Sequence, residues 1–424
     1  MNLRTRLRIF LSAALIAVFI FSTAGVQAAP ANAPTVTLRM WMFSNALTTG
    51  ETAVLNAYLA AHPDIAITLY NPADLMGELA AAAPGDLPDI IFYQNDAMPM
   101  LLLEHYLTPL DAYGVTRASL EAEFEPAAVE AAMYGNRAFA VPHLQEGIAL
   151  VYNKDLVTGD YLPDDPFDFA DLAAKAVQFK ADYPTKTLIC NQGFGGIDSY
   201  HVAPIFFGFG IPDYIDENGA IYVNDPRAVS AAQWIHDIHA VLADVNDYTT
   251  CQNRLIGGEV GMWWTGPWAI SALGSLNFGI HPMGVPYVSI KQLMVTQAAV
   301  TRGNPEEVVD FLLYFNNAAN SVNYATIDSL IPANTAALND PVVQQLPVIQ
   351  GFGAALALGT SLNKSMYTVC QWAPVGDAVN ELWNNPAADP QALLDTAQAQ
   401  VQECINDRRS QYFPYSLNLP LLRR

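Results

Sequence analysis

Two carboxylates, Asp96 and Glu146, each follow a strand-like stretch, in "FYQNDAMP" and "PHLQEGIALVYN". A pair of acids can hydrolyse a glycosidic bond when its two carboxyl groups are held about 5 to 10 Å apart. Ionised carboxylates can also accept hydrogen bonds from the hydroxyl groups of a bound sugar without any reaction. The sequence leaves both chemistries open, beside the common case of an acid that is only a solvated surface charge.

Aromatic side chains gather in "GEVGMWWTGPWAI", which places Trp263, Trp264 and Trp268 within six residues. Pro267 suits the first turn of a helix, so Trp268 is predicted to stand at a helix start beside free backbone N–H groups, where polar ligands bind. Trp263 and Trp264 precede it in an extended run, whose neighbours point to opposite faces. We expect these two rings to serve mostly as core packing and Trp268 to face a cleft.

Signatures of catalysis and of cofactor binding are missing from the sequence. It contains no G-x-S-x-G, no H-E-x-x-H and no G-x-x-x-x-G-K-[ST], and its glycine clusters at 193–196 and 351–356 do not form G-x-G-x-x-G. His236 and His239 stand three residues apart on a predicted helix, but a zinc site needs three or four ligands. We therefore expect no metal, no cofactor and no enzyme activity.

The elements that would position these residues alternate between strand and helix from Thr35 onward. "TVTLRMWMF", "IAITLY" and "DIIFY" predict strands, and helical stretches separate them, the first with Thr48 and Glu51 as a possible capping box. This order predicts a parallel sheet with helices on both faces. Ligands bind at the carboxyl ends of the strands in such sheets, which points to residues 41–45 and 93–96.

Composition bounds the class of protein. The chain has 424 residues, of which 52% are hydrophobic and 14% charged, enough apolar material for two globular domains. Its formal net charge is −22, from 19 basic and 41 acidic residues, and no basic stretch follows the N-terminal segment. Nucleic acids and anionic membranes are therefore poor candidates for partners.

The first 28 residues have the pattern of a secretory signal peptide. Arg4, Arg6 and Arg8 precede an apolar run, and Val26-Gln27-Ala28 provides a small-x-small cleavage site. We expect a secreted protein, periplasmic or extracellular. In that oxidising compartment four cysteines could form two disulfides, and their order in the sequence favours one of three possible connectivities. The favoured pairs are Cys190–Cys251 and Cys370–Cys404.

Several segments together resemble a known family. "GGEVGMWWTGPWAISALGSLNFGIHPM", "LRMWMF", "LPDIIFYQND", "AFAVPHLQEGIALVYNKDL", "VTRGNPEEVVDFLLYF" and "CQWAPVGDAVNELW" are similar, in order and spacing, to segments of the maltose/maltodextrin-binding family of bacterial extracellular solute-binding proteins. The resemblance spans nearly all of the chain after the signal. It implies a two-lobe periplasmic-binding-protein fold of type II, in which each lobe has a mainly parallel sheet flanked by helices and the ligand cleft lies between the lobes.

The resemblance also implies lobe limits and binding residues. Residues 35–144 and 294–335 would form the N-terminal lobe, and 145–293 and 336–424 the C-terminal lobe. The residues implied to bind the ligand are Trp41, Asn45, Tyr93, Asp96, Glu146, Tyr200, Trp268 and Trp372. Aromatic rings among them could pack on sugar rings while the polar side chains bind hydroxyls.

The predicted function is a solute receptor of an ABC importer. It would bind a mono- or oligosaccharide by hinge closure and present it, as a monomer, to membrane permease subunits. Two alternatives stay open at this stage. One is a secreted glycoside hydrolase that uses Asp96 and Glu146, and the other is the same fold with a non-sugar solute such as a peptide or a polyamine.

Overall fold

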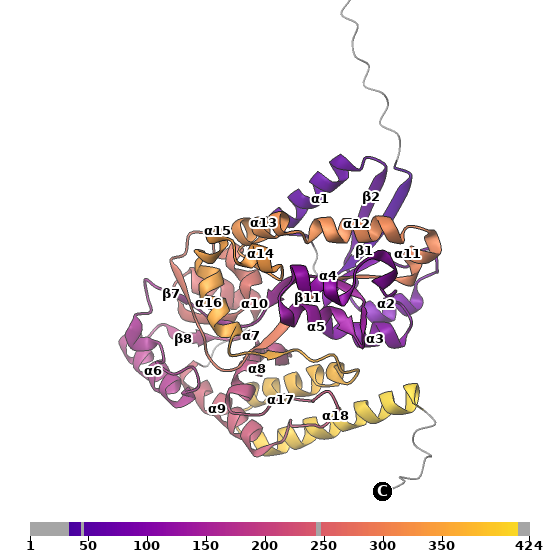
Figure 1. Cartoon of the computed structure of the whole chain (residues 1–424). Helices are drawn as coiled ribbons and strands as arrows, with labels where there is room; N and C mark the ends of the chain where they lie inside the picture. Colours follow the sequence, from indigo (N-terminus) through magenta and orange to yellow (C-terminus); the bar gives the residue numbers. More distant parts are fainter. Residues whose placement is uncertain (1–33, 44–45, 243–246, 414–424) are drawn as a thin grey trace, which may run out of the picture.

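The computed structural model describes residues 34–43, 46–242 and 247–413, and shows two α/β lobes, one at the upper right and the other at the left and bottom of Figure 1. The predicted signal peptide, 1–28, and Asn45 lie outside the described residues. None of the described helices is both long enough and apolar enough to cross a lipid bilayer.

The N-terminal lobe is built on a seven-stranded sheet in the order β12-β6-β11-β3-β1-β2, with β13 beside β11. β1 pairs in parallel with β2 and β3, whereas β11 runs antiparallel to β3 and β6. The strands are β1 (Val36–Met42), β2 (Ile65–Tyr70), β3 (Ile90–Gln94), β6 (Ala140–Glu146), β11 (Tyr287–Val295), β12 (Ile331–Pro332) and β13 (Thr360–Ser361). A separate hairpin joins β4 (Met133–Tyr134) to β5 (Arg137–Ala138).

The helices of this lobe begin where the sequence supplies caps. The Thr48 and Glu51 side chains form the predicted capping box at the start of α1, and Pro305 opens α12. The α-helices are α1 (Thr49–Ala61), α2 (Leu75–Ala81), α3 (Met98–Leu103), α4 (Arg117–Glu123), α5 (Pro126–Ala132), α11 (Gln297–Arg302), α12 (Pro305–Phe315), α13 (Ala318–Asp328) and α14 (Thr335–Leu338). Two 3₁₀ turns, η1 (Asn95–Ala97) and η2 (Asp111–Tyr113), follow β3 and α3.

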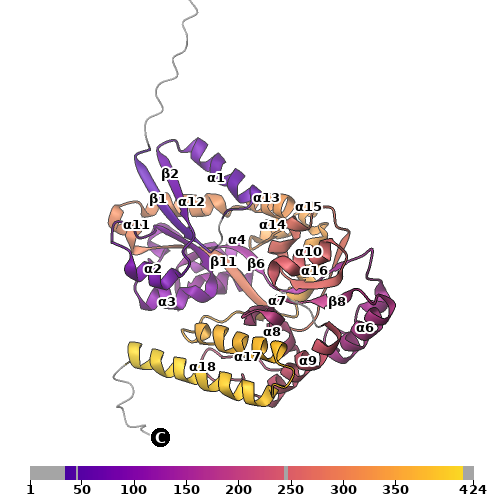
Figure 2. The same ribbon diagram turned by 180° about the vertical axis from the view of Figure 1, so that it is seen from behind.

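The C-terminal lobe has a four-stranded sheet in the order β10-β7-β9-β8. Its strands are β7 (Ala149–Asn153), β8 (Thr187–Cys190), β9 (Val260–Thr265) and β10 (Phe278–His281). Its α-helices are α6 (Phe169–Asp182), α7 (Gln192–Gly195), α8 (Ser199–Gly208), α9 (Pro226–Leu242), α10 (Tyr248–Ile256), α15 (Pro341–Gln344), α16 (Pro347–Leu356), α17 (Trp372–Asn384) and α18 (Pro390–Tyr412), and its 3₁₀ turns are η3 (Gly159–Tyr161), η4 (Pro267–Leu273) and η5 (Thr368–Cys370). Figure 2 shows α18 along the bottom of the molecule, below α17.

Two α/β lobes agree with the fold expected from the sequence, but the expectation of mainly parallel sheets needs correction. Both sheets are mixed, and in the C-terminal sheet β7 pairs antiparallel with β9 and β10 while only β8 and β9 are parallel. The chain passes between the lobes instead of winding each sheet in one direction. The strands next to the crossings pair antiparallel within the two main sheets: β6 with β11 and β12, β7 with β9 and β10, and β11 with β3 and β6.

Each lobe has its own hydrophobic core. One cluster of buried side chains gathers residues on both sides of the long insertion between β6 and β11, and a second fills the C-terminal lobe. A third cluster lies mainly in the C-terminal lobe and also includes Ala325 of α13 and Ile331 of β12. Trp263 and Trp264 are fully buried on β9 and belong to different clusters, because neighbouring strand residues point to opposite faces of the sheet. Both rings therefore pack in the core, as their place in an extended run predicts.

Two disulfides link elements within the C-terminal lobe. Cys190 at the end of β8 is bonded to Cys251 in α10, and Cys370 in η5 is bonded to Cys404 in α18. This is the pairing that the order of the cysteines favours. The second bond ties α18 to the segment that leads into α17.

Candidate functional site

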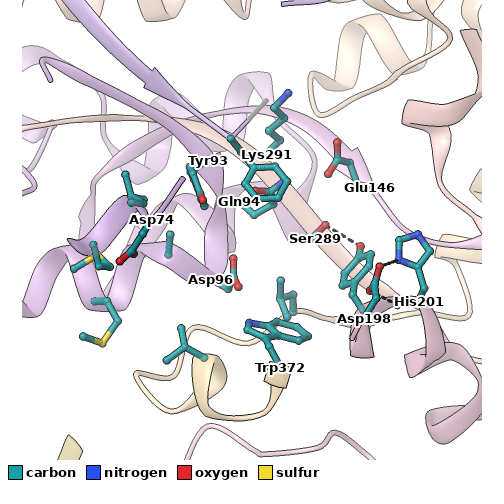
Figure 3. Close-up of a pocket in the computed structure, with 18 of the residues that line it drawn as sticks. Asp74, Tyr93, Gln94, Asp96, Glu146, Asp198, His201, Ser289, Lys291 and Trp372 are labelled. Carbon is teal, nitrogen blue, oxygen red and sulfur yellow. Dashed lines mark hydrogen bonds and ion pairs between the residues drawn. The ribbon is translucent and has the colours of Figure 1, made fainter. Parts of the chain in front are cut away.

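A cavity of about 930 Å³ lies between the lobes. Its walls come from the ends of β3, β6 and β11 and the start of α2 in the N-terminal lobe, and from α8, η4 and the start of α17 in the C-terminal lobe. Figure 3 shows Asp74, Tyr93, Gln94 and Asp96 on one side, Asp198 and His201 on the other, and Trp372 below them. The carboxyl ends of the predicted strands thus form one wall, as expected for an open α/β sheet.

Asp96 is held by its neighbour Asn95 in η1. The buried Asn95 side chain accepts a hydrogen bond from the backbone N–H of Ile290 at 3.0 Å and donates one to the carbonyl of Leu362 at 2.9 Å. Asn95 therefore ties the end of β3 both to β11 and to the chain that follows β13. The backbone that carries Asp96 is fixed by this clamp.

Asp96 and Trp372 meet across the cleft. The indole ring of Trp372, at the first residue of α17, points toward the carboxylate of Asp96, and its N–H favours the ionised form of that carboxyl group. Burial raises the pKa of Asp96 from 3.8 to about 6, although the hydrogen bond from Trp372 opposes the shift. The site thus keeps a carboxylate that is costly to ionise in a mostly apolar setting.

Glu146 is the second carboxylate of the cavity and ends β6, opposite Ser289 in the sheet register. Burial raises the pKa of Glu146, while the charge of Lys291 and a hydrogen bond to Gln94 oppose the shift. The Lys291 ammonium lies 3.8 Å from Oε1 of Glu51, a buried carboxylate at the start of α1. The positive charge of Lys291 therefore stabilises two carboxylates, Glu146 in the cavity and Glu51 behind it.

Aromatic side chains of the C-terminal lobe form the opposite wall. Tyr200 is hydrogen-bonded through its hydroxyl to Oγ of Ser289 at 3.0 Å, which joins α8 to β11. The half-buried Trp268 ring lies 6.4 Å from the Tyr200 ring and 5.8 Å from the His201 ring, measured between centroids. These rings offer apolar faces next to polar groups, the mixture that small-molecule sites use.

Beside these rings, Asp198 and His201 lie against each other at the start of α8 and line the cavity. Nδ1 of His201 lies 2.8 Å from Oδ2 of Asp198, and Gln192 donates a hydrogen bond to the same oxygen at 3.0 Å. Burial alone raises the pKa of Asp198, but the charge and hydrogen bonds of His201 outweigh it and bring the value to about 2. Asp198 therefore stays ionised and caps the helix that carries Tyr200.

Six of the eight implied binding residues line this cavity. They are Tyr93, Asp96, Glu146, Tyr200, Trp268 and Trp372. Asn45 lies outside the described residues. Trp41 is a correction: it is only 7% exposed and packs in the N-terminal core against Tyr70. β1 runs on to Met42, so Trp41 is still inside the sheet, and Phe43 is the residue that reaches the cavity.

Other cavity residues have no counterpart in the sequence analysis. In the N-terminal lobe these are Asp74, Met76, Met100, Ser289 and Lys291, and in the C-terminal lobe Gln192, Asp198 and His201. Phe43 and Gln94 also line the cavity, within the predicted ranges 41–45 and 93–96. Lys291 and Ser289 sit within the apolar pattern of a strand, and only the register of β11 brings them to the cleft. Asp198 was visible as an acid before a helix, the usual sign of an N-cap.

The acids of the cavity do not form a metal site. Within the described residues the structure gathers no group of three or more His, Cys, Asp or Glu side chains that could hold a metal ion. The cavity instead presents separate carboxylates, an ammonium, two amides and aromatic faces. Such a set suits a ligand with several hydroxyl groups and an apolar ring surface.

Replacing Asp96 with asparagine is expected to stabilise the ligand-free protein at neutral pH. The folded-state pKa of Asp96 is raised from 3.8 to about 6, so the protonated form favours folding below pH about 4, and that contribution is lost as the pH rises through 6. Asp96→Asn should raise the free energy of unfolding by about 1–2 kcal/mol at pH 7.5, since partial exposure reduces the full effect.

Urea denaturation at pH 7.5 and pH 4 measures this effect. The variant should gain stability over the wild type at pH 7.5 and little at pH 4. The exposed Asp86 is a matched position outside the cavity, and Asp86→Asn should show no such difference. An equal gain for Asp96→Asn at both pH values would contradict the interpretation.

Comparison with known proteins gives one matching family. The sequence profile described as "Bacterial extracellular solute-binding protein" matches residues 53–351, which is more than half of the chain. Proteins of that family are binding proteins rather than enzymes, and they act outside the cytoplasm.

Individual relatives agree with that match. A maltotriose-binding protein of Pyrococcus abyssi is 27% identical over 364 residues, which cover 81% of this chain and 77% of the relative. Among solved structures, the maltotriose-binding protein of Thermus thermophilus with bound maltotriose has a TM-score of 0.72 at 21% identity, covering 87% of this chain and 100% of that one. The GacH receptor of Streptomyces glaucescens, described unliganded and with acarbose, has a TM-score of 0.74 at 22% identity, with 90% and 99% covered.

Proposed function

The chain belongs to the bacterial extracellular solute-binding protein family, and from this premise we propose that it binds an oligosaccharide in the cavity between its lobes. One observation carries the proposal: Asp96 and Trp372, from opposite lobes, meet in a cavity that also holds Tyr93, Tyr200 and Trp268. Aromatic faces can pack on the C–H faces of sugar rings, and the carboxylates can accept hydrogen bonds from hydroxyl groups. The maltotriose-binding relatives support this choice of ligand class.

Binding would close the two lobes over the sugar. The lobes we propose are residues 35–144 with 294–335 and residues 145–293 with 336–424. The limit at residue 293 falls within β11, a strand that pairs in the sheet of the N-terminal lobe. The chain crosses between the lobes at the junction of β6 and β7 and again at the start of β11. At the start of β11, Tyr287 packs in the core of the C-terminal lobe, and Ile290 packs in the core of the N-terminal lobe. A ligand that contacts both walls binds the closed form more tightly and shifts the protein toward it.

Delivery of the sugar to an ABC importer is the biological role we propose. The first 28 residues would direct export, and the monomeric mature protein would release its sugar to membrane permease subunits outside the cytoplasm. Capture at micromolar concentration needs about −8 kcal/mol of binding free energy. Two or three stacked rings and several hydrogen bonds can supply that amount after the costs of ordering.

A glycoside hydrolase using Asp96 and Glu146 is the rival from another class. Each of these acids is already engaged by a neighbour, Asp96 by Trp372 and Glu146 by Gln94. Incubation of the purified protein with oligosaccharides tests the rival directly, and cleavage that Glu146→Gln abolishes would overturn the receptor proposal.

A thermal-shift screen with sugars, peptides and polyamines tests the class of ligand. A ligand at 100 times its Kd should add about 2.7 kcal/mol of stability to the folded protein. We expect maltotriose or a related oligosaccharide to raise Tm, and calorimetric titration to give one site per chain. If a polyamine or a peptide raises Tm and no sugar does, the carbohydrate proposal fails while the receptor fold stands.

A further inference from the structure

A second cavity of about 630 Å³ adjoins the first and lies between α2 and α3 of the N-terminal lobe and the end of α18. Four residues line both cavities: Asp74, Met76 and Met100 from the N-terminal lobe and Val369 from the C-terminal lobe. The shared residues come from both lobes, so the two spaces meet at one boundary. A small-molecule site usually occupies about 300–1,000 Å³, and the first cavity alone reaches the top of that range.

Arg408 of α18 lines the second cavity with an incompletely satisfied guanidinium. Its Nη1 lies 2.8 Å from Sδ of Met100, and a thioether is a weak acceptor. Its buried Nε has no hydrogen-bond acceptor within the part of the chain that the structure describes. A guanidinium has five N–H donors, and donors left without acceptors in a partly buried place favour a ligand that brings oxygen atoms.

The charges around Arg408 decide which oxygen-rich ligand fits. Three carboxylates, Asp74, Glu104 and Asp407, line the same cavity. An anion would be repelled by these acids, whereas a neutral polyhydroxyl compound can donate to them and accept from Arg408. The rings of Tyr106 and Tyr412 add aromatic surface to the walls.

The end of α18 is fixed against the N-terminal lobe. The hydroxyl of Tyr412 donates a hydrogen bond to Oε1 of Glu104, just beyond α3. Cys404, one turn before Arg408, is bonded to Cys370 in η5, two residues before Trp372. The wall of the second cavity is thus tied to the segment that supplies an aromatic ring to the first.

We propose that the second cavity binds further sugar units of an oligosaccharide whose first units occupy the cavity beside Trp372. This inference rests on the proposed function and adds to it the size of the ligand. In this proposal, Arg408 and Tyr412 determine how strongly the protein prefers a longer oligosaccharide over a shorter one. A ligand confined to the first cavity does not contact them, and a longer one does.

Calorimetric titration of the full chain with maltotriose and maltoheptaose tests this inference. For the wild type we expect maltoheptaose to bind about tenfold more tightly than maltotriose, the gain expected from one added charged hydrogen bond or ring contact. Arg408→Gln and Tyr412→Ala should each lower this ratio to about threefold or less. Arg409→Gln is the matched control, since Arg409 contacts Tyr367 and does not line the cavity.

The outcomes separate the two proposals. Equal affinities for the two sugars, or a tenfold ratio that persists in both Arg408→Gln and Tyr412→Ala, would overturn only the proposal that the second cavity binds sugar. A fall in the ratio that Arg409→Gln shares would also count against it, because the effect would then belong to α18 as a whole. Absence of binding by either sugar would overturn this inference together with the proposed function.

Discussion

Replacing Trp268 with alanine is expected to weaken oligosaccharide binding by more than tenfold without unfolding the protein. The ring is half-buried at the cavity wall, so its loss leaves no large hole in the core. It folds back over Gly266, where a Cβ atom would lie 2.1 Å from the ring, so it is oriented before the ligand arrives. A tenfold loss corresponds to about 1.4 kcal/mol, a modest value for a preorganised aromatic contact in a binding site.

Titration calorimetry and circular dichroism on Trp268→Ala measure the two parts of this prediction. Trp41→Phe provides the control, since the structure places Trp41 in the core and not on the cavity wall. We expect wild-type affinity from Trp41→Phe and, at most, a small loss of stability. Unchanged affinity in Trp268→Ala would assign that ring to packing, and a large loss in Trp41→Phe would contradict the position of the cavity.

Removal of the Cys190–Cys251 disulfide is expected to lower the free energy of unfolding by about 4 kcal/mol. The bond closes a loop with a sequence separation of 61 residues, and constraint of the unfolded chain by a loop of that size is worth about 4 kcal/mol. Both cysteines are fully buried, so the double alanine variant also loses packing. Denaturant unfolding with and without a reductant, and of Cys190→Ala/Cys251→Ala, measures the effect.

The second disulfide supplies a comparison within the same lobe. Cys370 and Cys404 are separated by 34 residues, so their removal should cost about 0.5 kcal/mol less in chain entropy. It should also lower the affinity for maltoheptaose, because Cys404 lines the second cavity. Identical unfolding curves for the oxidised and reduced wild type would show that these bonds do not stabilise the protein in solution.

Local structure was readable from the sequence wherever neighbours along the chain decide it. The capping box of Thr48 and Glu51, the opposite faces of Trp263 and Trp264, and the position of Trp268 after Pro267 all follow from backbone geometry over a few residues. The direction of the strands was less readable. Antiparallel pairing of β11 with β3 depends on where the chain returns from the other lobe, and no local pattern encodes that.

The candidate site divides in the same way. Tyr93 and Asp96 follow directly from the rule that ligands lie beyond the ends of parallel strands, because β3 ends at Gln94. The same rule failed for Trp41 by two residues, since the alternating pattern of β1 does not show where pairing with β2 stops. Because Trp41 is paired with Tyr70 of β2, the Trp41 ring lies within the sheet, and Phe43 is the first residue beyond the end of β1.

The sequence by itself determined the α/β class of fold, the end of β3 that carries Tyr93 and Asp96, and the position of Trp268 directly after Pro267, because hydrophobic periodicity and turn chemistry act over short stretches. The tertiary structure alone decided that Asp96 meets Trp372, that Ser289 and Lys291 face the cleft, and that Arg408 closes a second cavity against α3. The residues that meet in this way, such as Asp96 and Trp372 or Arg408 and Met100, are hundreds of positions apart in the sequence. Their contacts depend on strand register, on the crossings between the lobes and on the disulfide that anchors α18.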